Sequence, residues 1–195
     1  MFIVILVNFV SKRAERQNQQ TTQAFIEKEQ MANTTRKKDI SNLDFITIPV
    51  CISTPTGLIS EEITDTEQQL SALSEKKIVN FTGITNTELK LAYGAPNIDI
   101  LSEYDNNYLK LVRLLQKYAT LLYDNNLKDK AIEVLEFSLS TKSDISASYT
   151  LLARIYKEQG RTEDIKKVIE KAESLDSMTK GKLLKDLNEI LDSTD

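Results

Sequence analysis

The chain has 195 residues, of which 41% are hydrophobic and 28% charged, and its formal net charge is −4. It contains no His and a single Cys, which removes the commonest general base, the commonest metal ligand and any intramolecular disulfide. The acidic balance gives no support to nucleic-acid binding. Only three Pro and five Gly are present, which favours long helices.

Residues 1–10, MFIVILVNFV, are apolar except for Asn8, and Lys12, Arg13 and Arg16 follow closely. A helix of this length spans about 15 Å, whereas crossing a bilayer takes about 20 apolar residues. We therefore predict a truncated membrane anchor, whose basic flank would hold the following chain on the cytoplasmic side. The alternative is a buried strand in a cytoplasmic protein.

Residues 11–42 are polar and rich in Gln and Thr, without a hydrophobic period. We interpret them as a linker or stalk that is at most partly helical.

Residues 43–103 predict a small α+β unit. The β-branched and aromatic residues of 43–52 favour a strand, which Pro49 restricts to a sheet edge, and 77–81 favour a second short strand. Between them, Ser60 is placed to begin a helix with an apolar stripe. The stripe consists of Ile63, Leu70 and Leu73.

Residues 104–191 show apolar residues at helical spacing in blocks separated by short polar turns. Asn126 and Gly160 stand in two of these turns, where residues that tolerate a left-handed backbone are expected. The helices are expected at about 105–123, 129–140, 145–158, 163–174 and 178–191.

The same region aligns with itself when it is shifted by 34 residues, and such a period of paired helices is typical of stacked helical repeats. Small residues recur where two helices would cross closely, and large residues stand beside them. The matched pairs include Ala119 with Ala153, Leu122 with Tyr156, Asn126 with Gly160, Val134 with Val168, and Ser138 with Ala172.

The segment ASYTLLARIYKEQGRTEDIKKVIEKAESLDS resembles a tetratricopeptide repeat (TPR). Its first helix would carry the family's pattern in Tyr149, Leu152, Ala153 and Tyr156, and Gly160 would be the turn glycine. The preceding unit resembles the family more weakly. The resemblance implies a mainly α fold, an antiparallel helix-pair solenoid of about two repeats, in which the final helix, 178–191, would cap the array. The order of anchor, spacer and C-terminal repeats also resembles uncharacterised bacterial membrane-anchored repeat proteins.

In the tetratricopeptide family, partners bind in the groove lined by the first helix of each repeat. The Lys/Asn pattern of the carboxylate clamp that holds chaperone tails is not present here. The alternative interpretation of the groove positions is a set of solvated helix faces. The resemblance places the groove at Arg113, Gln116, Thr120, Tyr123, Thr150, Arg154 and Lys157, with Ala147 beside them.

The sequence thus predicts a non-catalytic scaffold or adaptor that binds a protein or peptide at a membrane. The alternative is a structural subunit of a cell-envelope complex that self-associates as a homo-oligomer. We expect no enzyme activity, because no catalytic spacing, phosphate loop or metal-ligand cluster is visible. No catalytic residue, cofactor, metal or nucleic-acid partner is therefore predicted.

Overall fold

The computed structural model describes residues 21–53, 57 and 60–193, and these residues are mainly helical. The chain divides into two compact units. Unit 1 comprises Met1–Leu43 and Ile84–Ser102, and unit 2 comprises Asp44–Gly83 and Glu103–Asp195. The segment 43–103, expected as one unit, is therefore shared between the two. The predicted anchor at 1–10 lies outside the described residues.

Unit 1 shows that part of the predicted polar linker is ordered as a helix, which spans residues 21–34. This helix is joined to α4 (Asn86–Tyr93) by hydrogen bonds between polar side chains. The Thr87 hydroxyl donates to Glu29, and Lys90 Nζ donates to Asn33 Oδ1 over 2.7 Å. The sequence predicts a linker that is at most partly helical, and its described part contains this one helix. The hydrogen bonds that join the helix to α4 come from polar side chains, which leave no hydrophobic period in the sequence.

A short 3-10 turn, η1 (Ala95–Asn97), follows α4. The buried Asn97 amide fixes the turn, since Nδ2 donates to the carbonyl of Lys38 at 2.8 Å and to that of Tyr93 at 2.7 Å. Lys38 N also donates to Tyr93 O at 3.0 Å. The extended residues after the 21–34 helix are therefore tied to the end of α4 by backbone and amide hydrogen bonds.

The two strands predicted at 43–52 and 77–81 are wrong, since the described residues contain no strand. Both segments are extended in part, yet a single backbone hydrogen bond joins them, from Ile46 N to Ile78 O at 2.9 Å. Pro49 has no N–H for a ladder, and α2 (Val50–Ser53) begins directly after it. The second segment bonds mainly to the long helix α5 instead. Its contacts are Lys77 O with Asn107 Nδ2, Val79 N with Tyr104 O, and Phe81 N with Asp105 Oδ1.

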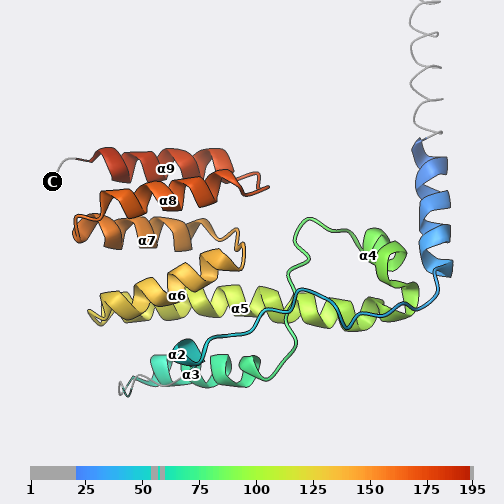
Figure 1. Ribbon diagram of the computed structural model, residues 1–195, viewed down its shortest axis with the longest axis horizontal. Coiled ribbons are helices and arrows are strands. Elements are labelled where there is room, and N and C mark those ends of the chain that lie inside the picture. The colour runs from blue at the N-terminus through green and yellow to red at the C-terminus, as the bar shows by residue number, and fades with distance from the viewer. Residues whose placement is uncertain (1–20, 54–56, 58–59, 194–195) are drawn as a thin grey trace, which may run out of the picture. The chain divides into compact units, whose positions relative to one another are not determined.

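Unit 2 holds most of the core and is built from helices that follow one another along the chain (Figure 1). The helix predicted after Ser60 is present as α3, with Ile63, Leu70 and Leu73 buried as expected. The five helices predicted from residue 105 onward are also present, although α5 begins earlier, at Ile98. The bounds are α3 Glu61–Ser74, α5 Ile98–Asp124, α6 Lys128–Ser140, α7 Ser146–Glu158, α8 Thr162–Glu173 and α9 Lys180–Asp192.

The helix bounds keep the 34-residue register found in the sequence. α7 and α9 begin and end 34 residues apart, and α5 ends 34 residues before α7. Asn126 and Gly160 both have a left-handed backbone, with φ of 63° and 68°. The residue after each donates back to the preceding helix, from Leu127 N to Leu122 O and from Arg161 N to Tyr156 O. The same helix-ending turn therefore occurs twice, one period apart.

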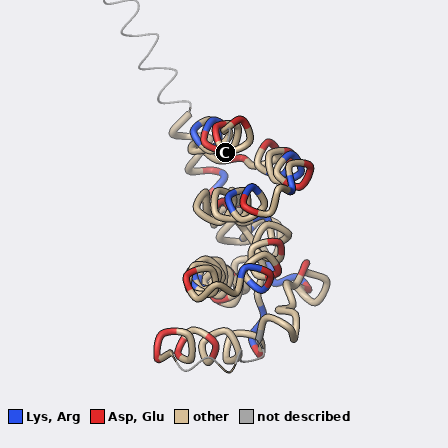
Figure 2. Tube along the Cα trace, turned by 90° about the vertical axis from the view of Figure 1, so that its left-hand side faces the viewer, with Lys and Arg blue, Asp and Glu red and all other residues tan. Residues whose placement is uncertain are grey.

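Small buried residues stand where the helices cross, as the sequence predicts. Ala153 of α7 is fully buried, and α7 contacts α6, α8 and α9. Figure 2 shows helices α5 to α9 turned toward the viewer, with Lys, Arg, Asp and Glu distributed along them. The other fully buried small residues are Ala119, Ala131, Ser138 and Ala172.

Helix α9 keeps the register of α7 but only part of its apolar face, with Leu183 and Leu187 buried in the core. Three positions that are buried in α7 hold charged residues in α9, and two of these, Lys185 and Glu189, form an exposed ion pair at 3.6 Å. A helix with a polar outer face suits the end of a helical array. The matched positions are Leu151 and Lys185, Leu152 and Asp186, and Ile155 and Glu189.

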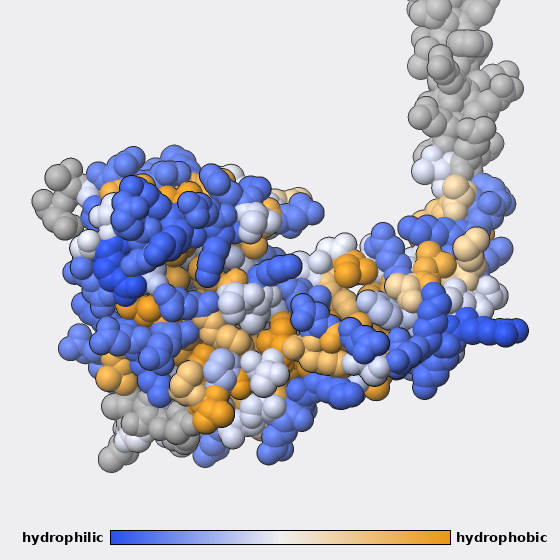
Figure 3. All heavy atoms as spheres, viewed as in Figure 1, coloured by the Kyte–Doolittle hydropathy of each residue, from blue (hydrophilic) through white to orange (hydrophobic). Residues whose placement is uncertain are grey.

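Hydrophobic residues reach the surface at α2 and the segment leading into it (Figure 3). Val50 is 78% exposed, whereas Ile52 in the same short helix is buried in the core. Among the described residues, no helix combines the length and the apolar character needed to cross a bilayer.

Candidate functional site

The predicted groove positions lie on adjacent faces of α5 and α7, which contact each other directly. Ser148 Oγ of α7 donates to Gln116 Oε1 of α5 over 2.6 Å. Gln116 also receives a hydrogen bond from Thr120, whose hydroxyl donates to the Gln116 carbonyl at 3.0 Å. Gln116 therefore joins the two helices and Thr120 bonds to it within α5, so the polar groups of both residues are already used within the fold.

Tyr123 is also engaged within the protein. Its hydroxyl donates to Glu158 Oε1 over 2.6 Å, and Lys128 Nζ lies 2.9 Å from Glu158 Oε2. The Tyr123 hydrogen bond, together with Lys128, lowers the pKa of the Glu158 carboxyl. The carboxylate in turn raises the pKa of Tyr123 and of Lys128. This cluster ties the ends of α5 and α7 to the start of α6.

Thr150 and Lys157 point their polar atoms at backbone carbonyls. The Thr150 hydroxyl donates to Ser146 O at 3.3 Å. Lys157 Nζ donates to Leu191 O at 3.1 Å and also to Ser193 O. A cation at this position satisfies the unpaired carbonyls at the end of α9 and complements its dipole. Lys157 is therefore a helix-capping residue in this structure.

Arg113 and Arg154 are the two predicted cations that stay exposed. Arg154 lies close enough to Glu158 to lower the pKa of that carboxyl, as the weakest of several contributions. Arg113 instead lies between two further cations of α5, Lys110 and Lys117. The three take part in none of the ion pairs found among the described residues.

A shallow hollow of 450 Å³ adjoins these three cations. Leu109, which is 39% exposed, and Leu114 give it an apolar lining, and Asn106 completes it. The predicted groove did not include Lys110 and Lys117, because the family resemblance fixes positions by repeat register and not by charge. Their spacing of three and four residues from Arg113, with no acidic residue between Asp105 and Asp124, is the sequence signal that marks this surface.

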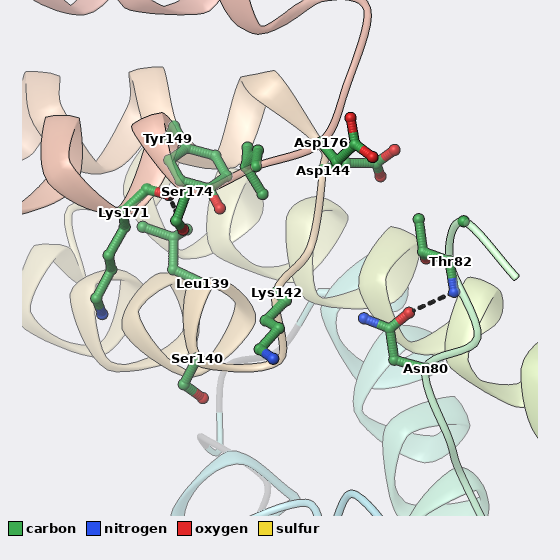
Figure 4. Close-up of a pocket in the computed structure, with 12 residues that line it drawn as sticks. Asn80, Thr82, Leu139, Ser140, Lys142, Asp144, Tyr149, Lys171, Ser174 and Asp176 are labelled. Atoms are coloured by element: carbon green, nitrogen blue, oxygen red, sulfur yellow. Dashed lines mark hydrogen bonds between the residues drawn. The ribbon is translucent and has the colours of Figure 1, made fainter.

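A larger open cavity of 630 Å³ lies at the other ends of the helices, where α6 and α8 finish. Figure 4 shows Lys142 and Lys171 with their amines turned away from the carboxylates of Asp144 and Asp176. Tyr149 lines the cavity and donates to Ser143 O at 2.9 Å. Burial raises its pKa to about 12, so the ring stays neutral and is no base at physiological pH.

Among the described residues, no group of three or more Cys, Asp or Glu side chains is placed to hold a metal ion, and Cys51 is exposed. The chain matches no protein-family model, no curated protein and no solved structure.

Proposed function

We propose that this chain is a non-catalytic protein-interaction scaffold, and that the open faces of α5 and α7 form its binding surface. The observation that carries the proposal is the set of exposed cations on these faces, with Arg113 on α5 and Arg154 on α7. A tetratricopeptide-like arrangement is part of the proposal. It is supported by the shared 34-residue register of α5, α7 and α9 and by the two equivalent helix-ending turns.

The contacts around the surface support a rigid platform. Gln116 and Ser148 link α5 to α7, and Lys157 fastens the end of α9 to α7. Helices joined in this way do not need to be ordered when a partner binds, which favours affinity. The polar groove residues that the fold itself uses therefore hold the surface, and the exposed arginines are left to contact the partner.

Membrane tethering through residues 1–10 is a separate part of the proposal. It is supported by the apolar run and the basic residues that follow it. Cell fractionation of the full chain, compared with a chain that begins at residue 21, measures it directly. Recovery of the full chain in the soluble fraction would argue for a cytoplasmic scaffold instead.

The scaffold function is tested by capture from a native extract on the immobilised full chain, with mass spectrometry of the bound proteins. The variant Arg113→Ala/Arg154→Ala should lose specific partners that the wild type retains, at an unchanged melting temperature. The control variant Lys166→Ala/Lys182→Ala removes two surface cations from α8 and α9, and it should retain the partners that the wild type captures. Light scattering runs in parallel. A stable oligomer whose assembly is lost in the arginine variant, with no partner captured, would favour a self-associating envelope subunit.

A further inference from the structure

We infer that the basic face of α5 recognises an acidic polypeptide segment that carries apolar side chains between its carboxylates. We call the face formed by Lys110, Arg113 and Lys117, with Leu109 and Leu114 beside them, the basic stripe. The inference rests on the proposed scaffold function and specifies its partner by charge and shape.

The basic stripe differs from the other charged helix faces of unit 2. On α8 two of the three cations pair with acids one turn away, Lys166 with Glu163 at 2.6 Å and Lys167 with Asp164 at 2.8 Å. On α9, Lys185 pairs with Glu189. The residues one turn before and after each cation of the basic stripe are uncharged or are another cation of the stripe.

Like charges three and four residues apart on a helix repel each other. Lys110 and Arg113 are three apart, and Arg113 and Lys117 are four apart, so the stripe weakens α5 when nothing is bound. A ligand with carboxylates would remove this repulsion and form charge-assisted hydrogen bonds, for which the Arg113 guanidinium is suited. The arrangement is therefore one that bound negative charge would stabilise.

The size of the stripe restricts the ligand. Lys110 and Lys117 lie seven residues apart, about 10 Å along the helix axis. Two turns of a partner helix, or about three residues of an extended chain, cover this distance. The hollow of 450 Å³ with its leucine lining would take up an apolar side chain between the carboxylates.

The charge of the unit favours a polypeptide over larger polyanions. Unit 2 contains 17 Lys and Arg against 23 Asp and Glu, so its formal charge is −6 and the stripe is a local exception. A nucleic acid or an anionic bilayer extends well beyond the stripe and meets this net negative charge. A short acidic segment contacts the cations alone.

The test measures binding of a fluorescein-labelled synthetic peptide to the full chain by fluorescence anisotropy. The peptide carries Glu at every third or fourth position with Leu between them, and a matched peptide carries Gln in place of Glu. We expect the Glu peptide to bind at least about tenfold more tightly, a difference that three exposed ion pairs can supply. The preference should shrink as salt is raised, because exposed charges are screened.

Three variants make the test specific. Lys110→Gln/Arg113→Gln/Lys117→Gln should abolish the preference for Glu, and Lys110→Glu/Arg113→Glu/Lys117→Glu should bind a Lys-substituted peptide instead. The control Lys180→Glu/Lys182→Glu/Lys185→Glu makes the same charge change on α9 and should leave the preference intact. Circular dichroism of each variant ensures that only folded protein is compared. A reversed variant that fails to gain the Lys peptide would overturn the inference.

Competition experiments decide between ligand classes. Anionic phospholipid vesicles and single-stranded RNA should displace the Glu peptide poorly. If either displaces it at lower charge concentration than unlabelled peptide, the polypeptide assignment is wrong. If native partners are lost in the arginine variant yet the Glu peptide shows no preference, the scaffold stands and only the acidic-segment inference fails. If the peptide binds as expected but no partner is captured, the scaffold function fails.

Discussion

Gly94→Ala should destabilise unit 1, and by more than alanine at any other described glycine destabilises the protein. Both the backbone conformation of Gly94 and the atoms next to it exclude a side chain. Gly94 has φ 94° and ψ 140°, a region that residues with a Cβ almost never occupy. A Cβ at this position would lie 2.2 Å from Arg36 O and 2.8 Å from Lys37 Cα. The obstacle is backbone, which cannot rotate away as the tip of a flexible side chain would.

The surrounding hydrogen bonds prevent the two segments from separating. Lys38 N donates to Tyr93 O and Ala95 N donates to Thr35 O, each over 3.0 Å, so bonds lie on both sides of the contact. Backbone strain costs about 1–3 kcal/mol and overpacking about 1–3 kcal/mol. Alanine also lowers the conformational entropy of the unfolded chain, which offsets about 0.4–1 kcal/mol of this destabilisation. We expect a net loss of about 1–5 kcal/mol.

Hydrogen exchange followed by mass spectrometry shows in which region of the chain the stability is lost. Amides in 35–38 and 86–97 should exchange at least about fivefold faster, since each tenfold corresponds to about 1.4 kcal/mol. Gly160→Ala is the first control, since its φ is also positive but its Cβ meets no atom within 4 Å. Gly181→Ala, in the open on helix α9, should be neutral or stabilising by up to about 1 kcal/mol. If Gly94→Ala exchanges in this region no faster than Gly160→Ala, the close-contact reasoning is refuted.

Three further outcomes are expected in unit 2. Leu152→Ala removes a buried side chain from α7 and should lower the free energy of unfolding by about 2–5 kcal/mol in urea denaturation; a change below about 1 kcal/mol would contradict its place in the core. Tyr118→Phe removes the donor at 2.9 Å from the buried Glu67 and should cost about 1–3 kcal/mol, measured against the partly buried control Tyr123→Phe, which should cost less. Glu158→Gln should alter the pH dependence of stability. The pKa of Glu158 lies below its ordinary value of about 4.3, so its contribution is complete above that pH and is lost as the pH falls through the folded-state pKa. If the stability difference between wild type and Glu158→Gln persisted unchanged well below pH 4, the ionised Glu158 carboxylate would not be its source.

The sequence could indicate the proposed binding surface only in part. Repeat register selected Arg113 and Arg154, and both are exposed, on α5 and α7. It did not distinguish them from Gln116 and Lys157, which the fold uses for its own hydrogen bonds. Which polar group is available depends on what lies opposite it, and Lys157 meets the end of a helix that begins more than 20 residues later in the chain.

The strand predictions failed for a related reason. β-Branched residues at 77–81 indicate an extended, half-buried segment, and the segment is extended and partly buried. Whether such a segment forms a ladder depends on the backbone that lies beside it. Here the side chains of Asn107 and Asp105 take up its hydrogen bonds, and helical neighbours offer no ladder of their own.

The sequence by itself determined the helices from residue 105 onward, their 34-residue register and the left-handed turns at Asn126 and Gly160. These features are local, because hydrophobic period and backbone preference act within a few residues. The tertiary structure alone decided the tight crossing at Gly94, the helical state of 21–34 and the partners of the polar groove residues. These features depend on groups far apart in the chain, whose approach is set by packing and not by any pattern within one segment.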